Sequence, residues 1–195
     1  TGPQVIAQSI LLDFLLPVVA VFAAYLLFLR LSRSRGIATA AALIFFVGMF
    51  PLEFGRSVSP QLHMLFVLVA LLALWEVARS PDARRGNAVI AAVSIGLLAY
   101  LYTYYAVFVF MFTALLGAVF WFQGERLRAR QLFGIVLGAV AVALPYVIFF
   151  MRAVRLPEYA EALRRIGLIE THFPSGIAIV IPGTILLVVF AALWF

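Results

Sequence analysis

Long apolar runs separated by short polar turns dominate this sequence and leave it few ways to fold. They cover residues 5–29, 36–54, 62–77, 88–103, 104–122, 132–151 and 176–195. A helix needs roughly 20 apolar residues to cross the hydrocarbon core of a bilayer. Hydrophobic residues make up 66% of the chain and charged residues 11%, whereas about a quarter of a soluble domain is charged. The pattern therefore predicts an all-α polytopic transmembrane helical bundle of about seven spans in a single domain, residues 1–195.

The run at residues 88–122 contains no charged residue and is too long for one simple crossing. As a single helix it would be roughly 52 Å long, whereas the hydrocarbon core is about 30 Å thick. Two crossings with a reversal near Tyr102–Tyr105 fit better, since tyrosines are enriched at membrane–water interfaces. The alternative is one tilted helix with an end outside the membrane.

The basic residues are all arginines, and they are unevenly distributed over the turns. With seven crossings, the turns at 30–35, 79–85 and 124–130 share one side and carry nine of the fourteen arginines. The other side carries Arg56, Arg152, Arg155, Arg164 and Arg165. The positive-inside rule then places the nine-arginine side in the cytoplasm, and we expect a bacterial cytoplasmic membrane. Because these arginines lie between apolar runs, we expect lipid headgroups as their partners and no nucleic acid.

Cysteine is absent, so disulfides and thiolate metal sites are excluded. The sequence begins at Thr1 and stops at Phe195 within an apolar run, and we expect it to be a fragment of a longer chain. The first apolar run is too long for a signal peptide and lacks a small-residue cleavage site.

The polar segment 152–175 is the first candidate for chemistry. The segment Leu156–Tyr159 is expected to open an amphipathic helix on the extracytoplasmic membrane surface, with Pro157 in its first turn and Glu158 near its positive end. The candidates to bind the phosphate of a lipid-linked substrate are Arg164, Arg165 and His172. Arginine suits this role because its planar guanidinium group can donate two hydrogen bonds to phosphate oxygens at once. The alternative is a passive connector whose arginines meet lipid phosphates.

The turn at 53–63 is the second candidate. Its polar residues would line the rim of an extracytoplasmic cavity as substrate-binding groups, and they are Glu53, Arg56, Gln61 and His63. The alternative is a solvated loop in which Glu53 pairs with Arg56 and Ser59 caps the next helix. One carboxylate and one histidine are too few ligands for a metal site, so none is assigned here.

Two local contacts are also expected. Gly134, Gly138 and Ala141 fall on one helical face and predict close helix packing. Glu76, at the cytoplasmic end of its span, is expected to pair with Arg79, three residues later.

The order of these features resembles a known enzyme family. An arginine-rich turn precedes a span that ends near Pro51, an outer turn carries Arg56, and the stretch Ile95–Tyr105 begins a tight pair of crossings. This layout is similar to the membrane domain of GT-C-type glycosyltransferases, such as the protein O-mannosyltransferase and aminoarabinose transferase relatives.

The resemblance implies transfer of a sugar from a polyprenyl-phosphate carrier to an acceptor on the extracytoplasmic face. In the family, an acidic residue of the first outer loop acts as base or positions a divalent metal, and that loop would precede Thr1. Some members have an aspartate where this chain has Pro60 and Gln61, and Tyr104 or Tyr105 lies near the position of a family lysine. No catalytic residue is therefore assigned within the chain, and a divalent metal follows from the resemblance alone.

Two other functions remain open from the residues. A transporter or flippase usually has charged residues near the bilayer midplane, and the apolar runs here have almost none. The third possibility is a membrane assembly subunit without catalytic activity.

Overall fold

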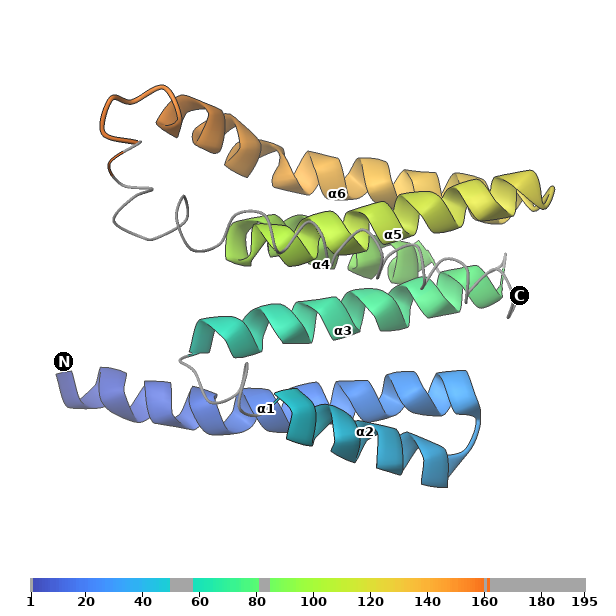
Figure 1. The fold of residues 1–195 in the computed structure, drawn as a ribbon, viewed down its shortest axis with the longest axis horizontal. Coiled ribbons are helices and arrows are strands. Elements are labelled where there is room, and N and C mark those ends of the chain that lie inside the picture. Colours follow the sequence, from blue (N-terminus) through green and yellow to red (C-terminus); the bar gives the residue numbers. More distant parts are fainter. Residues whose placement is uncertain (1, 50–57, 81–84, 160, 162–195) are drawn as a thin grey trace.

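The computed structural model describes residues 2–49, 58–80, 85–159 and 161, and the regular elements among them are helices (Figure 1). In chain order these are α1 (Gly2–Ser32), α2 (Arg35–Met49), α3 (Val58–Arg79), α4 (Arg85–Leu101), α5 (Thr103–Phe122) and α6 (Arg126–Ala153). The predicted all-α class is confirmed for these residues. Helices α1, α3, α5 and α6 are long and apolar enough to cross a membrane, whereas α2 and α4 are shorter apolar helices. The run 176–195 lies outside the described residues, so the number of seven spans stays a prediction.

Helix α3 begins earlier than the sequence predicts. Ser59 and Pro60 lie in its first turn, after Val58, so the expected N-cap at Ser59 is wrong. Proline is tolerated there because the first N–H groups of a helix have no acceptor within the helix.

The long apolar run breaks at a single residue, Tyr102. Its backbone is extended, with φ −158° and ψ 98°, between the end of α4 at Leu101 and the start of α5 at Thr103. An extended conformation is open to any L-residue and suits aromatic side chains, so the break requires no glycine or proline. One continuous tilted helix is therefore excluded.

Polar contacts join the turns at one end of the bundle, which we call the arginine end. Arg30 of α1 forms an ion pair with Glu76 of α3, with 3.3 Å between Nη1 and Oε1. Arg128 of α6 places Nη2 3.5 Å from the carbonyl oxygen of Arg79. Helices α1, α3 and α5 therefore run toward this end and α2, α4 and α6 away from it, as Figure 1 shows at the right of the view. The predicted Glu76–Arg79 pair is wrong because α1 brings the guanidinium of Arg30 to the Glu76 carboxylate.

The turn between α5 and α6 has a geometry that favours glycine. Gly124 has φ +84°, and its N–H donates to the carbonyl of Trp121 while the next N–H, of Glu125, donates to that of Phe120. This is a Schellman motif, which satisfies two carbonyl groups at the end of α5 and reverses the chain in few residues.

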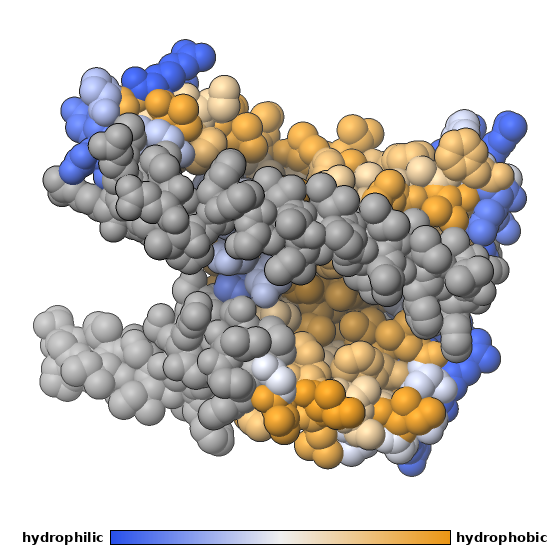
Figure 2. All heavy atoms as spheres, in the orientation of Figure 1, coloured by the Kyte–Doolittle hydropathy of each residue, from blue (hydrophilic) through white to orange (hydrophobic). Residues whose placement is uncertain are grey.

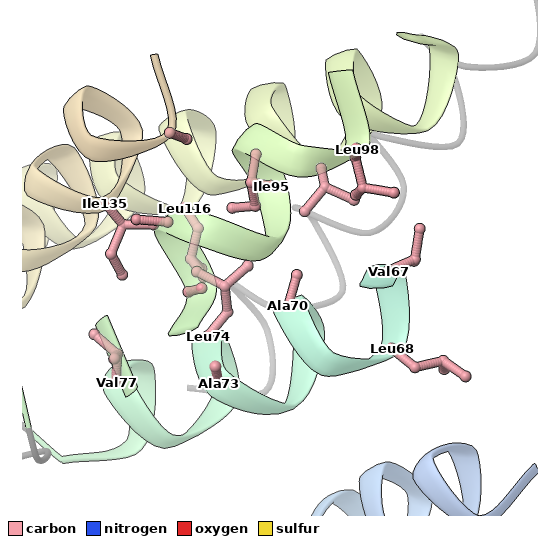
Figure 3. Packing of buried hydrophobic residues seen from close by; sticks show 14 of the residues in the cluster. Val67, Leu68, Ala70, Ala73, Leu74, Val77, Ile95, Leu98, Leu116 and Ile135 are labelled. Carbon is pink, nitrogen blue, oxygen red and sulfur yellow. The ribbon is translucent and has the colours of Figure 1, made fainter. Parts of the chain in front are cut away.

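The core runs along α3, which packs against α1 on one side and α4 on the other, while α6 packs against α4 and α5. Figure 3 shows α3 side chains facing those of α4, α5 and α6. The buried residues labelled there are Val67, Leu68, Ala70, Ala73, Leu74, Val77, Ile95, Leu98, Leu116 and Ile135.

Small residues bring α4 and α6 into close approach. A Cβ atom added at Gly96 would lie 2.5 Å from Cβ of Val142, and one at Gly138 would lie 3.0 Å from Cβ of Ala92. Packing through small residues is typical of helices in lipid, where burial of apolar surface adds little. The predicted packing face is wrong in part, because Gly134 and Ala141 are exposed and a Cβ added at Gly134 would meet nothing within 4 Å.

The outside of the bundle is apolar. Ile44 is 73% exposed, Leu137 70% and Phe149 71%, and in Figure 2 the hydrophilic atoms gather mainly near the two ends of the visible face. Patches of this kind are unfavourable in water over so long a surface. Together with the four long apolar helices, they identify an integral membrane protein.

Candidate functional site

Most of the predicted binding residues lie outside the described part of the chain. These are Glu53, Arg56, Arg164, Arg165 and His172. The backbone of Gln61 belongs to the first turns of α3. Of the seven residues, only His63 has a described side chain, so the assignment of these residues to substrate binding stays a prediction.

His63 lies in the second turn of α3 and is only 3% exposed. Its ring stacks on that of Tyr102, with 4.8 Å between ring centroids and 25° between planes. The ring of Tyr105 lies 5.0 Å from it at 49°. Tyr102 and Tyr105 are also 5.0 Å apart, so the three rings contact one another pairwise. We call these three residues the His63 cluster.

The chain reversal at Tyr102 builds the His63 cluster. Tyr102 is the extended residue between α4 and α5, and Tyr105 lies in the first turn of α5. His63 lies near the start of α3, which runs toward the arginine end. Two tyrosines from the turn and one histidine from a neighbouring helix therefore meet at the opposite end of the bundle, which we call the tyrosine end.

A second polar group at the tyrosine end connects the same turn to α6. The Tyr100 hydroxyl donates to the carbonyl of Val142 over 3.0 Å, and the hydroxyls of Thr103 and Tyr146 lie 3.3 Å apart. The rings of Tyr100 and Tyr146 are 5.3 Å apart at 54°. These bonds fix the α4–α5 turn to α6, whose C-terminal part bends in Figure 1 and contains Pro145.

The chain after α6 differs from the predicted amphipathic helix at its start. Residues 154–158 form turns and a bend, so of the four residues expected to open the helix only Tyr159 is helical. Tyr159 is helical and packs edge-on against Phe150, with 6.0 Å between ring centroids. The rest of the predicted helix, through Arg164 and Arg165, lies outside the described residues.

Among the described residues, those at the tyrosine end offer more hydrogen-bonding groups and aromatic surface than charged groups. Tyr102 and Tyr104 are 41% and 37% exposed, so an apolar ring with a polar tip is accessible at each position. Exposed Arg152 and Arg155 add positive charge at the end of α6. Within residues 2–49, 58–80, 85–159 and 161, no three His, Asp or Glu side chains group as metal ligands. Glu53 and His172 lie outside that part, so the divalent metal stays a prediction.

The contact between His63 and the tyrosines is what sequence reasoning missed. The sequence predicts the tyrosines as part of an interfacial belt and His63 as part of the rim of an extracytoplasmic cavity, without a contact between them. Once residues 88–122 are read as two crossings, however, Tyr102 and the start of α3 must lie at the same end of the bundle. That shared end is the signal by which the sequence could have linked His63 to Tyr102.

The chain matches no family model, no curated protein and no solved structure.

Proposed function

We propose that this chain is the membrane part of a glycosyltransferase that takes a sugar from a polyprenyl-phosphate donor at the extracytoplasmic face. The His63 cluster, at the end of the bundle opposite the arginine end, is the observation that carries the proposal. In this proposal the chain makes seven spans in a bacterial cytoplasmic membrane. The arginine end faces the cytoplasm by the positive-inside rule, so the tyrosine end faces outward.

The chemistry of the tyrosine end suits a lipid-linked sugar. Such a donor keeps its polyprenyl chain in the bilayer and its phosphate and sugar at the interface. Tyr102 and Tyr104 combine an exposed ring with a hydroxyl group, and this combination can contact a sugar ring and hydrogen-bond its hydroxyls. His63, predicted to bind substrate, is buried and stacks on Tyr102, so in this proposal it positions the ring of Tyr102 and does not itself touch the sugar.

The phosphate requires a cationic clamp that stabilises it as the sugar departs. We assign this role to Arg56, Arg164 and Arg165, assisted by His172, with Glu53 and Gln61 contacting the sugar. The catalytic base, and any divalent metal that it positions, would belong to a preceding outer loop. These roles rest on the sequence prediction that the residues lie in extracytoplasmic turns and on the family resemblance.

The transport alternative finds less support in the described residues. Their buried polar side chains are His63, Ser94 and Thr113, and none of these carries a fixed charge. Thr113 hydrogen-bonds within its own helix, to the carbonyl of Val109 over 2.7 Å. Substrate and ion pathways through membranes usually contain ionisable residues that face the bundle interior.

Transfer of radiolabelled sugar from polyprenyl phosphate by the full-length protein in proteoliposomes tests the proposal. In the variant Arg164→Gln with Arg165→Gln, we expect donor affinity to fall at least about tenfold, since hydrogen bonds to charged groups contribute roughly 1.5–3 kcal/mol each. The matched control, Arg33→Gln with Arg35→Gln, removes two arginines from the opposite end and is expected to keep wild-type affinity.

Unchanged donor binding and turnover in the Arg164/Arg165 variant would rule out the clamp. Absence of any sugar transfer by the wild-type protein, together with flux of the lipid-linked sugar across the bilayer, would replace the proposal with a flippase. Absence of both activities would favour an assembly subunit.

A further inference from the structure

An apolar groove lies between α5 and α6 at the arginine end, far from the His63 cluster. It is lined by Ala118, Trp121 and Phe122 of α5 and by Phe133 of α6. Phe122 is 88% exposed and Trp121 47%, so both rings are presented outward at the end of a helix long enough to span a membrane. Aromatic residues in this position are typical of the membrane–water interface.

Two exposed arginines stand at the mouth of this groove. The guanidinium carbon of Arg126 lies 5.9 Å from the ring centroid of Trp121, which lines the groove. Arg130 follows four residues later and Phe133 seven residues later, so all three lie on one face of α6. Both arginines are exposed, and the N-terminal end of α6 adds a partial positive charge of its own.

The neighbouring Arg128 is engaged elsewhere, which separates it from this pair. It contacts Glu125 at 3.7 Å and the carbonyl of Arg79 at 3.5 Å, and its guanidinium lies 5.5 Å from the ring of Phe120. These contacts hold Arg128 toward α3 and the core. Arg126 and Arg130 are the arginines of this helix turn that remain on the outer face.

The same face of α6 continues as an open apolar strip along the helix. Gly134, next to Phe133, would accept a Cβ atom with nothing within 4 Å, and Leu137, one turn further, is 70% exposed. The aromatic groove, with two arginines at its mouth, is thus continued by an exposed apolar strip along one face of α6. This is the arrangement that an anionic head group with an attached acyl chain would complement.

We propose that this groove is a binding site for an anionic phospholipid of the leaflet at the arginine end. Arg126 and Arg130 bind the phosphate, for which the planar guanidinium is well suited. An acyl chain lies in the groove against Trp121 and Phe133 and continues along Leu137. Glu125, the carboxylate next to Arg126 in the sequence, contacts Arg128 at 3.7 Å, so the positive charges of Arg126 and Arg130 favour an anionic head group over a zwitterionic one. The site does not depend on glycosyl transfer, so either proposal can fail without the other.

Trp121 is a reporter within the proposed site. We would prepare full-length protein in which Trp121 is the sole tryptophan and place it in nanodiscs that contain brominated phosphatidylglycerol or brominated phosphatidylcholine. Bromine quenches tryptophan fluorescence at contact distance, so the mole fraction for half-maximal quenching gives the relative affinity of each lipid. For two arginines we expect a preference for phosphatidylglycerol of roughly tenfold to thirtyfold, from about 1 kcal/mol per arginine near an anionic lipid.

The variant Arg126→Gln with Arg130→Gln is expected to reduce this preference to less than about twofold, whereas Arg152→Gln with Arg155→Gln at the tyrosine end leaves it unchanged. Because both arginine pairs are exposed, neither variant disturbs the core. In the wild-type protein, the preference also decreases as salt is added, because salt screens exposed charges. Equal quenching by the two brominated lipids in the wild type, or a preference that survives loss of Arg126 and Arg130, would overturn the proposal.

Discussion

The approach of α4 to α6 at Gly96 gives a sharp prediction for stability. A Cβ atom at this position would lie 2.5 Å from Cβ of Val142, 2.6 Å from its Cγ1 and 2.9 Å from the carbonyl oxygen of Ala139. Carbon atoms in favourable contact are about 3.5–4.0 Å apart, so the two helices would have to separate by about an ångström. A Cβ and a backbone carbonyl cannot move away by changing rotamer. The substitution Gly96→Ala therefore forces a shift of backbone.

The expected size of the effect follows from two opposing contributions. Overpacking costs about 1–3 kcal/mol, and the rigid partners of Gly96 put it toward the upper end of that range. Replacing a helical glycine by alanine gains about 1 kcal/mol. We expect Gly96→Ala to lower the free energy of unfolding by about 2 kcal/mol. The matched control, Gly134→Ala, meets no atom within 4 Å and is expected to raise it by up to about 1 kcal/mol.

Equilibrium unfolding in mixed micelles of mild detergent and dodecyl sulfate, followed by circular dichroism, measures both variants against the wild type. The difference between the two alanine variants, about 3 kcal/mol, is the more robust quantity because helix propensity cancels from it. A Gly96→Ala variant as stable as Gly134→Ala would refute the close approach of α4 and α6.

Two further predictions concern the turns. Tyr102→Ala removes the ring that stacks on His63 and should destabilise the protein by at least about 1 kcal/mol and reduce sugar transfer, whereas Tyr102→Phe keeps the stacking and most of the stability. Chemical denaturation and the transfer assay measure both variants. Equal stability of the two variants would contradict the contact. Gly124→Ala forces an alanine into a backbone conformation with φ +84° and should destabilise the protein by about 1–2 kcal/mol in the same unfolding assay. A stabilised variant would contradict the Schellman geometry.

Hydropathy was sufficient to predict the helices of the described residues but not which of their faces are buried. In a soluble protein, an apolar stripe marks the buried side of a helix, because the other side faces water. Here α5 is apolar around its whole circumference, and its buried Leu116 and exposed Leu115 are the same residue type in adjacent positions. The face of α6 built on Gly134 was therefore misassigned, although Gly138 does pack closely against Ala92.

The tertiary contacts of polar residues could not be predicted from their neighbours in the sequence either. Glu76 has a basic residue three positions away in its own helix, but α1 brings Arg30 to it from a distant part of the sequence. The reversal at Tyr102 could be placed from the length of the apolar run and its tyrosines. Its contact with His63 depends on how α3 lies beside the α4–α5 pair, and helix packing decides that.

The proposed function depends on the orientation of the bundle in the membrane. Cysteine labelling tests this orientation directly, because the chain contains no cysteine of its own. Single cysteines would be placed at exposed or partly exposed turn positions by Ser80→Cys and Gln123→Cys at the arginine end and Leu156→Cys at the tyrosine end. In intact cells, a membrane-impermeant maleimide should label the cysteine at 156 and reach those at 80 and 123 only after permeabilisation. Labelling of positions 80 and 123 from opposite sides of the membrane would contradict the paired crossings, the shared arginine end and the outward-facing His63 cluster.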